Sequence, residues 1–281
     1  MTDEPAPQPP VAGPQAHSRP PTPDADPNTP GAPGSPGRGR RSRRRSTRTP
    51  RAGTAAQVVR SIPQRRTVEI AGGSALTLLV LACHTEDTTA IDVASGALVR
   101  ARIDWPEDHD PDLAPFDVVE AVLADEPERD DLAQPEAVTV AGLPRHLGTL
   151  HGRHAKRLLL TLTTPVEEHV LGFPGASAPY WEFRGARPSI ALVVPTKGPV
   201  LFRRAGDRQV WVRFGWGRSD NWLPVEDAGA RRALDVARRD RLAGKDLSSA
   251  LGFKPHYLVV SLSAPRDGHS YKTVRAILPR S

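Results

Sequence analysis

The stretch that decides the fold lies at residues 200–216 and reads VLFRRAGDRQVWVRFGW. Runs rich in β-branched and aromatic residues lie on both sides of Gly206-Asp207, two residue types that are common in tight turns. The stretch therefore predicts two antiparallel strands. Because successive side chains of a strand point to opposite faces, the second strand has two sets of side chains: Trp211, Arg213 and Gly215 on one face, and Val212, Phe214 and Trp216 on the other.

Strand patterns continue on both sides of this stretch. Alternating or β-branched runs bounded by Gly, Pro and Asp predict strands at residues 67–71, 75–83, 88–93, 97–103, 116–124, 137–141, 180–184, 190–194, 257–262 and 270–278. Residues 156–164 are also expected to be extended, although the leucines at 158–160 fit a helix equally well. We expect the strands of residues 180–216 to form a meander with a turn at Lys197-Gly198, and residues 265–268 to close a hairpin.

One helix is predicted at residues 227–242, and a short one is expected at residues 246–251. Alanine and leucine recur on one face of the first helix. Its last turn carries cations, which interact favourably with the helix dipole: Arg238, Arg239 and Arg241. The predicted fold class is α+β and β-rich, with a mostly antiparallel sheet or partly open barrel and one helix in the C-terminal half.

The first 63 residues have a different composition from the rest. Between Thr2 and Gln57, Val11 is the only residue among Val, Ile, Leu, Met and the aromatic types. A segment without apolar side chains cannot offset the entropy of ordering its backbone, about 1–2 kcal/mol per residue. We therefore predict a disordered Pro/Arg-rich tail at residues 1–63 and a single globular domain at residues 64–281.

Charge is distributed unevenly along the chain. The tail has ten arginines and four acidic residues, whereas residues 64–281 have 28 basic and 28 acidic residues. Within the domain, residues 86–136 have a net charge of −13 and residues 137–281 a net charge of +12. One interpretation is that the two blocks face each other and neutralise. The other is that the second half offers a basic surface to a polyanion.

A run of arginines in the tail predicts contact with nucleic acid or another polyanion. Guanidinium groups on a flexible chain bind phosphates without a fixed structure and release counterions. The residues concerned are Arg38, Arg40, Arg41, Arg43, Arg44, Arg45 and Arg48. The alternatives are a solubilising tail, or one that meets anionic lipid or an acidic protein.

Trp211, Arg213 and Arg218 are the candidate nucleic-acid contacts of the domain. An exposed face of Trp and Arg could stack bases and hold phosphates. The competing interpretation is that the aromatic residues between 202 and 222 are simply core. The sequence pattern of residues 246–258 also resembles that of a helix-turn-helix, but the alternation at residues 258–262 favours a strand there.

The histidines at 146, 151 and 154 suggest an alternative, a metal-dependent hydrolase. Three imidazoles can hold a catalytic zinc with one position open. The flanking Arg153 and Lys156 would repel a dication, so a basic loop is the preferred interpretation. The aspartates at 108, 110 and 112 have calcium-loop spacing, but Leu113 replaces the required glycine. We expect no bound metal or cofactor and lean towards a non-enzymatic protein.

Cys83 is the only cysteine, which fits a reducing compartment and a cytoplasmic protein. It also ends an apolar run preceded by Arg65-Arg66, a pattern similar to a twin-arginine lipoprotein signal. Glu69 and the long tail argue against such a signal, and the run is too short to span a bilayer, which takes about 20 residues. We favour a buried strand, and the alternative is an exported interaction module that is lipid-anchored at Cys83.

Overall fold

The computed structural model describes residues 71–106, 112–125, 134–150, 152–183, 188–204 and 206–280. These residues form three sheets with helices between them, and every named strand pair except β3–β5 is antiparallel. The predicted β-rich, mostly antiparallel fold class is therefore confirmed. The predicted tail, its boundary at residue 63 and most of the strand expected at 67–71 lie outside the described residues.

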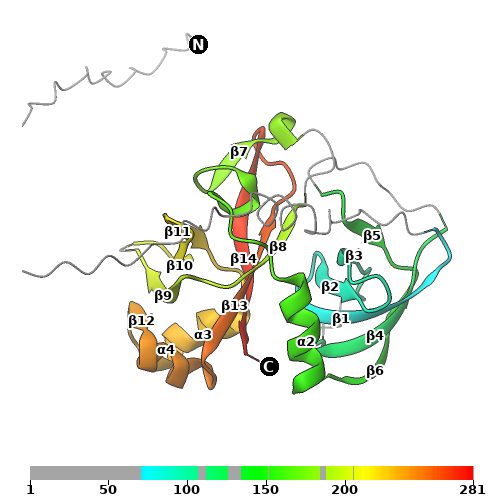
Figure 1. The fold of residues 1–281 in the computed structure, drawn as a ribbon, viewed down its shortest axis with the longest axis horizontal. Coiled ribbons are helices and arrows are strands. Elements are labelled where there is room, and N and C mark those ends of the chain that lie inside the picture. Colours follow the sequence, from blue (N-terminus) through cyan, green and yellow to red (C-terminus); the bar gives the residue numbers. More distant parts are fainter. Residues whose placement is uncertain are drawn as a thin grey trace, which may run out of the picture. The chain divides into compact units, whose positions relative to one another are not determined.

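The first sheet has the strand order β5-β3-β2-β1-β4-β6 (Figure 1). Its strands are β1 (Ala75–Cys83), β2 (Thr88–Asp92), β3 (Leu98–Arg102), β4 (Asp117–Val122), β5 (Ala137–Thr139) and β6 (Arg145–Thr149). Backbone hydrogen bonds join the end of β4 to β5, from Ala124 N to Thr139 O at 3.0 Å and from Ala141 N to Val122 O at 2.7 Å. The sheet therefore curls into the predicted partly open barrel.

The apolar run that ends at Cys83 forms β1, in the middle of this sheet. Leu78 and Val80 point into the barrel core, whereas Leu79 and Leu81 pack against the C-terminal strands. A strand buried on both faces needs a continuous apolar run, which explains the resemblance of this segment to a signal sequence. Cleavage before Cys83 would remove a strand that pairs with both β2 and β4.

Helix α2 (Arg153–Leu162) follows the barrel and corrects the prediction of an extended segment at 156–164. Ala155 and Leu159 are four residues apart and fully buried, and Leu158 packs against the same cluster as Leu159. Side chains three and four apart share one face of a helix. The leucine run therefore reflects helical spacing.

The second sheet has the order β7-β14-β13-β8. Its strands are β7 (Ser177–Pro179), β8 (Ile190–Val193), β13 (Pro255–Leu262) and β14 (His269–Pro279). The predicted C-terminal hairpin is confirmed, and strand β13 shows that the helix-turn-helix alternative is wrong. The short 3-10 helices η1 (Val170–Gly172) and η2 (Tyr180–Phe183) flank β7, so the strand expected at 180–184 is also wrong.

The third sheet has the order β11-β10-β9-β12. Its strands are β9 (Lys197–Arg203), β10 (Val210–Trp216), β11 (Ser219–Pro224) and β12 (Arg241–Ala243). Strands β9 to β11 form a meander, but β8 does not join it, because β8 pairs with β13. The four side chains of β8 alternate between two core clusters, so that this strand needs cover on both faces. The predicted turn at Lys197-Gly198 is instead the start of β9.

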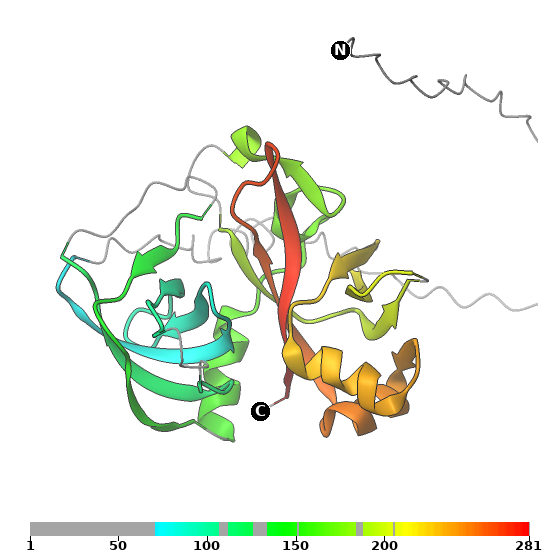
Figure 2. The same cartoon turned by 180° about the vertical axis from the view of Figure 1, so that it is seen from behind.

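Two helices lie beside the third sheet (Figure 2). Helix α3 (Ala228–Ala237) is shorter than predicted, because Arg238 adopts the left-handed conformation with φ 50° and ends it. Asp227 caps α3 by accepting a hydrogen bond from Ala230 N at 2.9 Å. Helix α4 (Gly244–Leu251) ends at Gly252, as expected. Arg241, which was predicted to lie in the last helical turn, therefore belongs to strand β12.

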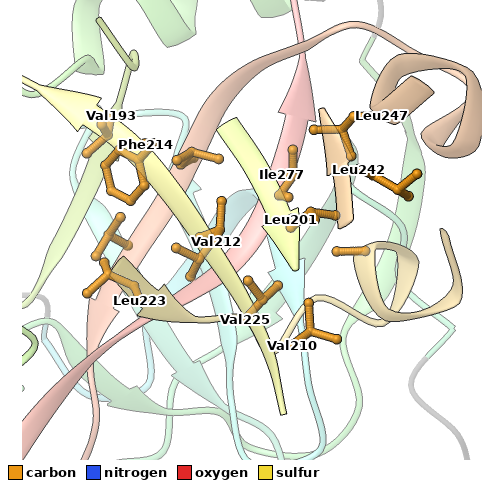
Figure 3. Packing of buried hydrophobic residues seen from close by; sticks show 14 of the residues in the cluster. Val193, Leu201, Val210, Val212, Phe214, Leu223, Val225, Leu242, Leu247 and Ile277 are labelled. Atoms are coloured by element: carbon orange, nitrogen blue, oxygen red, sulfur yellow. The ribbon is translucent and has the colours of Figure 1, made fainter. Parts of the chain in front are cut away.

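The largest hydrophobic cluster lies on the inner face of the third sheet (Figure 3). Leu201 and Val212 of that sheet meet Val193 of β8 and Ile277 of β14 there, and Leu247 of α4 closes one side. Among the described residues no helix has the length and apolar character needed to cross a membrane.

A buried charge network joins the barrel to the C-terminal strands. Asp87 accepts from Arg100 Nη1 at 2.8 Å and from Arg275, and Arg275 Nη1 also donates to Glu226 at 2.5 Å. Arg100 Nη2 donates to the carbonyl oxygen of Leu262 at 3.0 Å. The two arginines lie 175 positions apart in the sequence and share one carboxylate.

Candidate nucleic-acid interface

The third sheet packs one face on the core and presents the other to solvent. Along β10, Val212, Phe214 and Trp216 are buried, whereas Trp211 is half-buried and Arg213 is exposed. The two faces contain the residues that the alternation predicted. Phe214 and Trp216 belong to the core, as the core interpretation expects, whereas Trp211 is only partly buried.

Strand pairing brings further side chains to the solvent face. Trp211 lies opposite Phe202 of β9, which lies opposite Arg241 of β12. Arg213 lies opposite Val200 and, on the other side, Trp222 of β11. Directly opposed residues of paired strands point to the same side of a sheet. We call the resulting surface the aromatic–arginine face: Val200, Phe202, Trp211, Arg213, Trp222 and Arg241.

Trp211 is held in place by two contacts. The guanidinium of Arg204 lies 3.9 Å from the centre of its ring, a cation–π contact. The indole N–H donates to Asp207 Oδ2 at 3.0 Å, and this hydrogen bond lowers the pKa of Asp207. The orientation of the ring is therefore fixed, and Arg204 covers one side of it.

Trp222 is the most exposed aromatic side chain of the face, at 45%. Its ring meets Phe202 edge-on, with centroids 5.4 Å apart, and the guanidinium of Arg213 lies 5.3 Å from its centre. Aromatic side chains that are held by neighbours but remain exposed offer a stacking surface at little cost in side-chain entropy.

Acidic residues neutralise part of the positive charge. Arg213 Nη2 donates to Asp220 Oδ2 at 2.6 Å, and this hydrogen bond lowers the pKa of Asp220. Arg203 pairs with Asp235 at 2.6 Å. Arg241 is exposed and has no ion pair among the described residues. Arg241 is therefore the cation of the face that is most available to an anionic ligand.

A shallow hollow of about 290 Å³ lies over this face. It is lined by the apolar side chains of Val200, Phe202 and Trp222 and by Arg203, Arg213, Asp240 and Arg241. Small-molecule pockets span roughly 300–1,000 Å³, so the hollow lies at the lower end of that range. Aromatic side chains beside three arginines suit a flat, negatively charged ligand.

The structure brings only two of the predicted contact residues together. Trp211 and Arg213 lie on the same face, but Arg218 lies in the turn after β10. There it lines a separate surface hollow with Glu167 and Glu168, two acidic side chains that would repel a phosphate. The predicted tail contacts, Arg38 to Arg48, lie outside the described residues.

Four residues of the face were not among the predicted contacts: Val200, Phe202, Trp222 and Arg241. Phe202 and Trp222 belong to the aromatic group that was singled out, but no strand was predicted at 219–224 to place Trp222 beside Arg213. Arg241 was assigned to a helix. The local signal for β11 is weak, because Trp222 and Leu223 are its only two large apolar residues and Pro224 follows them.

Of the three histidines, His146 and His154 lie in the described part of the chain. His146 Nε2 lies 3.5 Å from Asp117 Oδ1, and Thr149 donates to the same oxygen at 2.8 Å. Although desolvation opposes it, hydrogen bonds from Ala114 N and from Thr149 lower the pKa of Asp117. His151 lies outside the described residues, and no three His, Cys, Asp or Glu residues inside them could hold a metal ion.

Cys83 has no catalytic base beside it among the described residues. Its Sγ lies 3.2 Å from Thr88 Oγ1, and burial raises the pKa of the thiol. The neighbouring His84 ring bonds instead to the backbone carbonyl of Arg275 at 3.0 Å. A protonated thiol is a poor nucleophile, so the structure gives Cys83 a packing environment.

The aromatic–arginine face thus combines fixed aromatic rings, a hollow and a cation, Arg241, that has no ion pair within the described ranges. It offers stacking and charge, which are means of binding a ligand. Comparison with known proteins adds nothing to this geometry: no family model matches the chain, and neither does any curated protein.

Proposed function

We propose that the protein is a non-enzymatic, nucleic-acid-associated protein that holds single-stranded segments on the aromatic–arginine face. Unpaired bases stack on Trp222 and Phe202, and Arg241 and Arg213 contact the backbone phosphates. Arg38 to Arg48 of the tail add sequence-independent phosphate contacts. The observation that carries the proposal is the exposed Trp222 ring beside Arg213, over the hollow that Arg241 borders.

Stacking favours single strands over duplexes on this face. Every base has a π-face that can stack on an aromatic side chain, which contributes about 1–3 kcal/mol per base. In a duplex these base faces are already stacked, so a flat protein face reaches mainly the backbone. Asp220 and Asp240 limit the net charge here, which makes stacking more important than charge for this surface.

The first test measures the affinity of the full chain for a labelled single strand and a labelled duplex across a salt series. Trp222→Ala should weaken single-strand binding by about 5- to 150-fold, which corresponds to the loss of one stacked base. Trp181→Ala is the matched control, because Trp181 is similarly exposed, at 51%, but lies in η2 beside Tyr180 and His269. Equal affinity of the two variants would contradict the proposal.

The second test concerns the tail. Replacing Arg43, Arg44 and Arg45 together by Gln in the full chain should flatten the salt dependence of single-strand binding. The slope of log affinity against log salt should fall by about 0.7 for each arginine that contacts a phosphate. An unchanged slope and affinity would remove the tail from the binding surface. If the unaltered chain binds neither strand at low salt, the protein-interaction alternative is the better one.

A further inference from the structure

A basic surface that differs from the aromatic–arginine face lies around His256, at the end of the β13–β14 hairpin where β13 begins and β14 ends. Pro255 at the start of β13 pairs with Pro279 at the end of β14, so Lys254 and Arg280 flank the last pair of the hairpin. The C-terminal end of the described chain lies beside the lower part of α2 in both views (Figures 1 and 2). Leu159 of α2 packs in the same hydrophobic cluster as Tyr257 and Leu278 of the hairpin, and this packing holds α2 beside the hairpin end.

Among the described residues, the charges that act on His256 are all positive. Burial is the main cause that lowers the pKa of His256, and the positive charges of Arg280, Lys254 and Lys156 lower it further. No carboxylate of the described residues contributes to the shift in the pKa of His256. None of the three cations has an ion pair in the described part of the chain, and Lys254 and Arg280 are exposed.

Helix α2 adds an independent preference for an anion. Its N-cap Gly152 offers no side-chain cap, and its first turn has no acidic residue. It begins instead with Arg153, His154, Lys156 and Arg157. Cations at a helix N-terminus oppose the helix dipole, and the free N–H groups there attract anions. This end of α2 therefore lacks the negative charge that such an end normally has nearby.

We propose that Lys156, Lys254, His256 and Arg280 form a binding site for a phosphate group, separate from the aromatic–arginine face. A phosphate has several acceptor oxygens and up to two negative charges, which matches a cluster of several donors. Arg280 can donate two parallel hydrogen bonds, and the lysines act as point charges. His256 becomes a further donor when the bound anion offsets the surrounding positive charge and the ring takes up a proton.

The phosphate group can belong to a free phosphate monoester or to a nucleic-acid backbone. The test separates these sources by following the ring of labelled His256 by NMR in the full chain at low ionic strength. Inorganic phosphate is the first probe, and a short single strand without terminal phosphates is the second. Binding of either probe should raise the pKa of His256 by about one unit, because a negative charge then lies beside the ring.

Variants test whether the cluster is the site. Lys254→Gln and Arg280→Gln should each weaken binding about tenfold, since each removes a charged donor. Arg266→Gln is the matched control, because Arg266 is an exposed arginine in the turn at the far end of the same hairpin.

Each outcome has one meaning. A response to inorganic phosphate alone assigns the site to free phosphate compounds, and a response to the single strand assigns it to the backbone. Trp222→Ala should leave the inorganic phosphate response unchanged, so that failure of the stacking proposal is seen separately. If neither probe changes the titration of His256, or if Arg266→Gln has the same effect as Arg280→Gln, the proposed site is wrong.

Discussion

Replacement of Asp87 by Asn tests the buried charge network that joins the barrel to the C-terminal strands. Asp87 is the only carboxylate that contacts both Arg100 and Arg275 among the described residues, and the side chains of these arginines are 2% and 7% exposed. Asparagine keeps the volume of the side chain but removes its charge. The variant thus leaves two buried guanidinium groups with a single neutral acceptor between them.

The structure sets the size of the expected effect. Removing one partner from a buried ion pair costs about 3–5 kcal/mol, because the remaining charge stays desolvated. Arg275 keeps Glu226 and Arg100 keeps the Leu262 carbonyl, so we expect the lower part of that range. In a domain of about 200 residues each kcal/mol lowers Tm by about 2–4 °C, which gives a shift of about 6–12 °C.

Urea unfolding followed by tryptophan fluorescence measures this loss, and Asp246→Asn provides the control. Asp246 accepts from Arg239 Nη1 at 2.6 Å, but the two side chains are 63% and 60% exposed. An exposed pair contributes at most about 1 kcal/mol. If Asp87→Asn lowers the unfolding free energy no more than Asp246→Asn does, the burial and pairing of Asp87 do not contribute to stability, and the reasoning is refuted.

Three further predictions concern single side chains. Burial lowers the pKa of Lys272 to about 8 from its ordinary value of 10.5. Because the unfolded chain keeps this proton to higher pH, the unfolding free energy should rise between pH 8 and 10.5, by up to about 3 kcal/mol. Urea titrations of Lys272→Met across this pH range should lack the rise. A Cβ at Gly215 would lie 2.9 Å from the Lys197 side chain, so Gly215→Ala should lower the unfolding free energy by about 1–3 kcal/mol. Gly198 has open space around it, so Gly198→Ala should lower the unfolding free energy by less than about 0.5 kcal/mol. Burial raises the pKa of Cys83, so mass spectrometry should show alkylation of the native chain at least about tenfold slower than in urea; equal rates would mean that the thiol is accessible.

The elements with strong local signals could be predicted from the sequence. Strand β10 is a run of β-branched and aromatic residues that follows a turn, and α4 ends at a glycine, so the bounds of both could be predicted nearly correctly. Strand β1 could be predicted although its pattern also fits a signal sequence, because Glu69 and the tail argued against the signal. For β10 and α4 the deciding features are local in sequence, and for β1 the continuous apolar run is sufficient to indicate a buried strand.

The elements that depend on distant partners could not be predicted. Strand β12 is three residues long and exists because Arg241 to Ala243 pair with β9, about forty positions earlier. Its sequence is compatible with the end of α3, and no local feature reveals the left-handed Arg238. Strand β8 likewise pairs with β13 and not with its sequence neighbour β9, because both faces of β8 are buried, in two different hydrophobic clusters. The candidate site needed β11 and β12, so only its β10 part, Trp211 and Arg213, could be found.

The pairing of β8 with β13 has a consequence for the order in which the chain folds. Val193 lies opposite Leu258, so this pairing closes a loop of about 65 residues, at an entropic cost of roughly 4 kcal/mol from the length-dependent part alone. The β13–β14 hairpin closes about ten residues, from Leu262 to Lys272, at about half that cost. We therefore expect β13–β14 and the β9–β11 meander to form early, with β8 docking between them late. Since β8 contributes to two core clusters, its arrival completes both at once, and folding should be slow and cooperative.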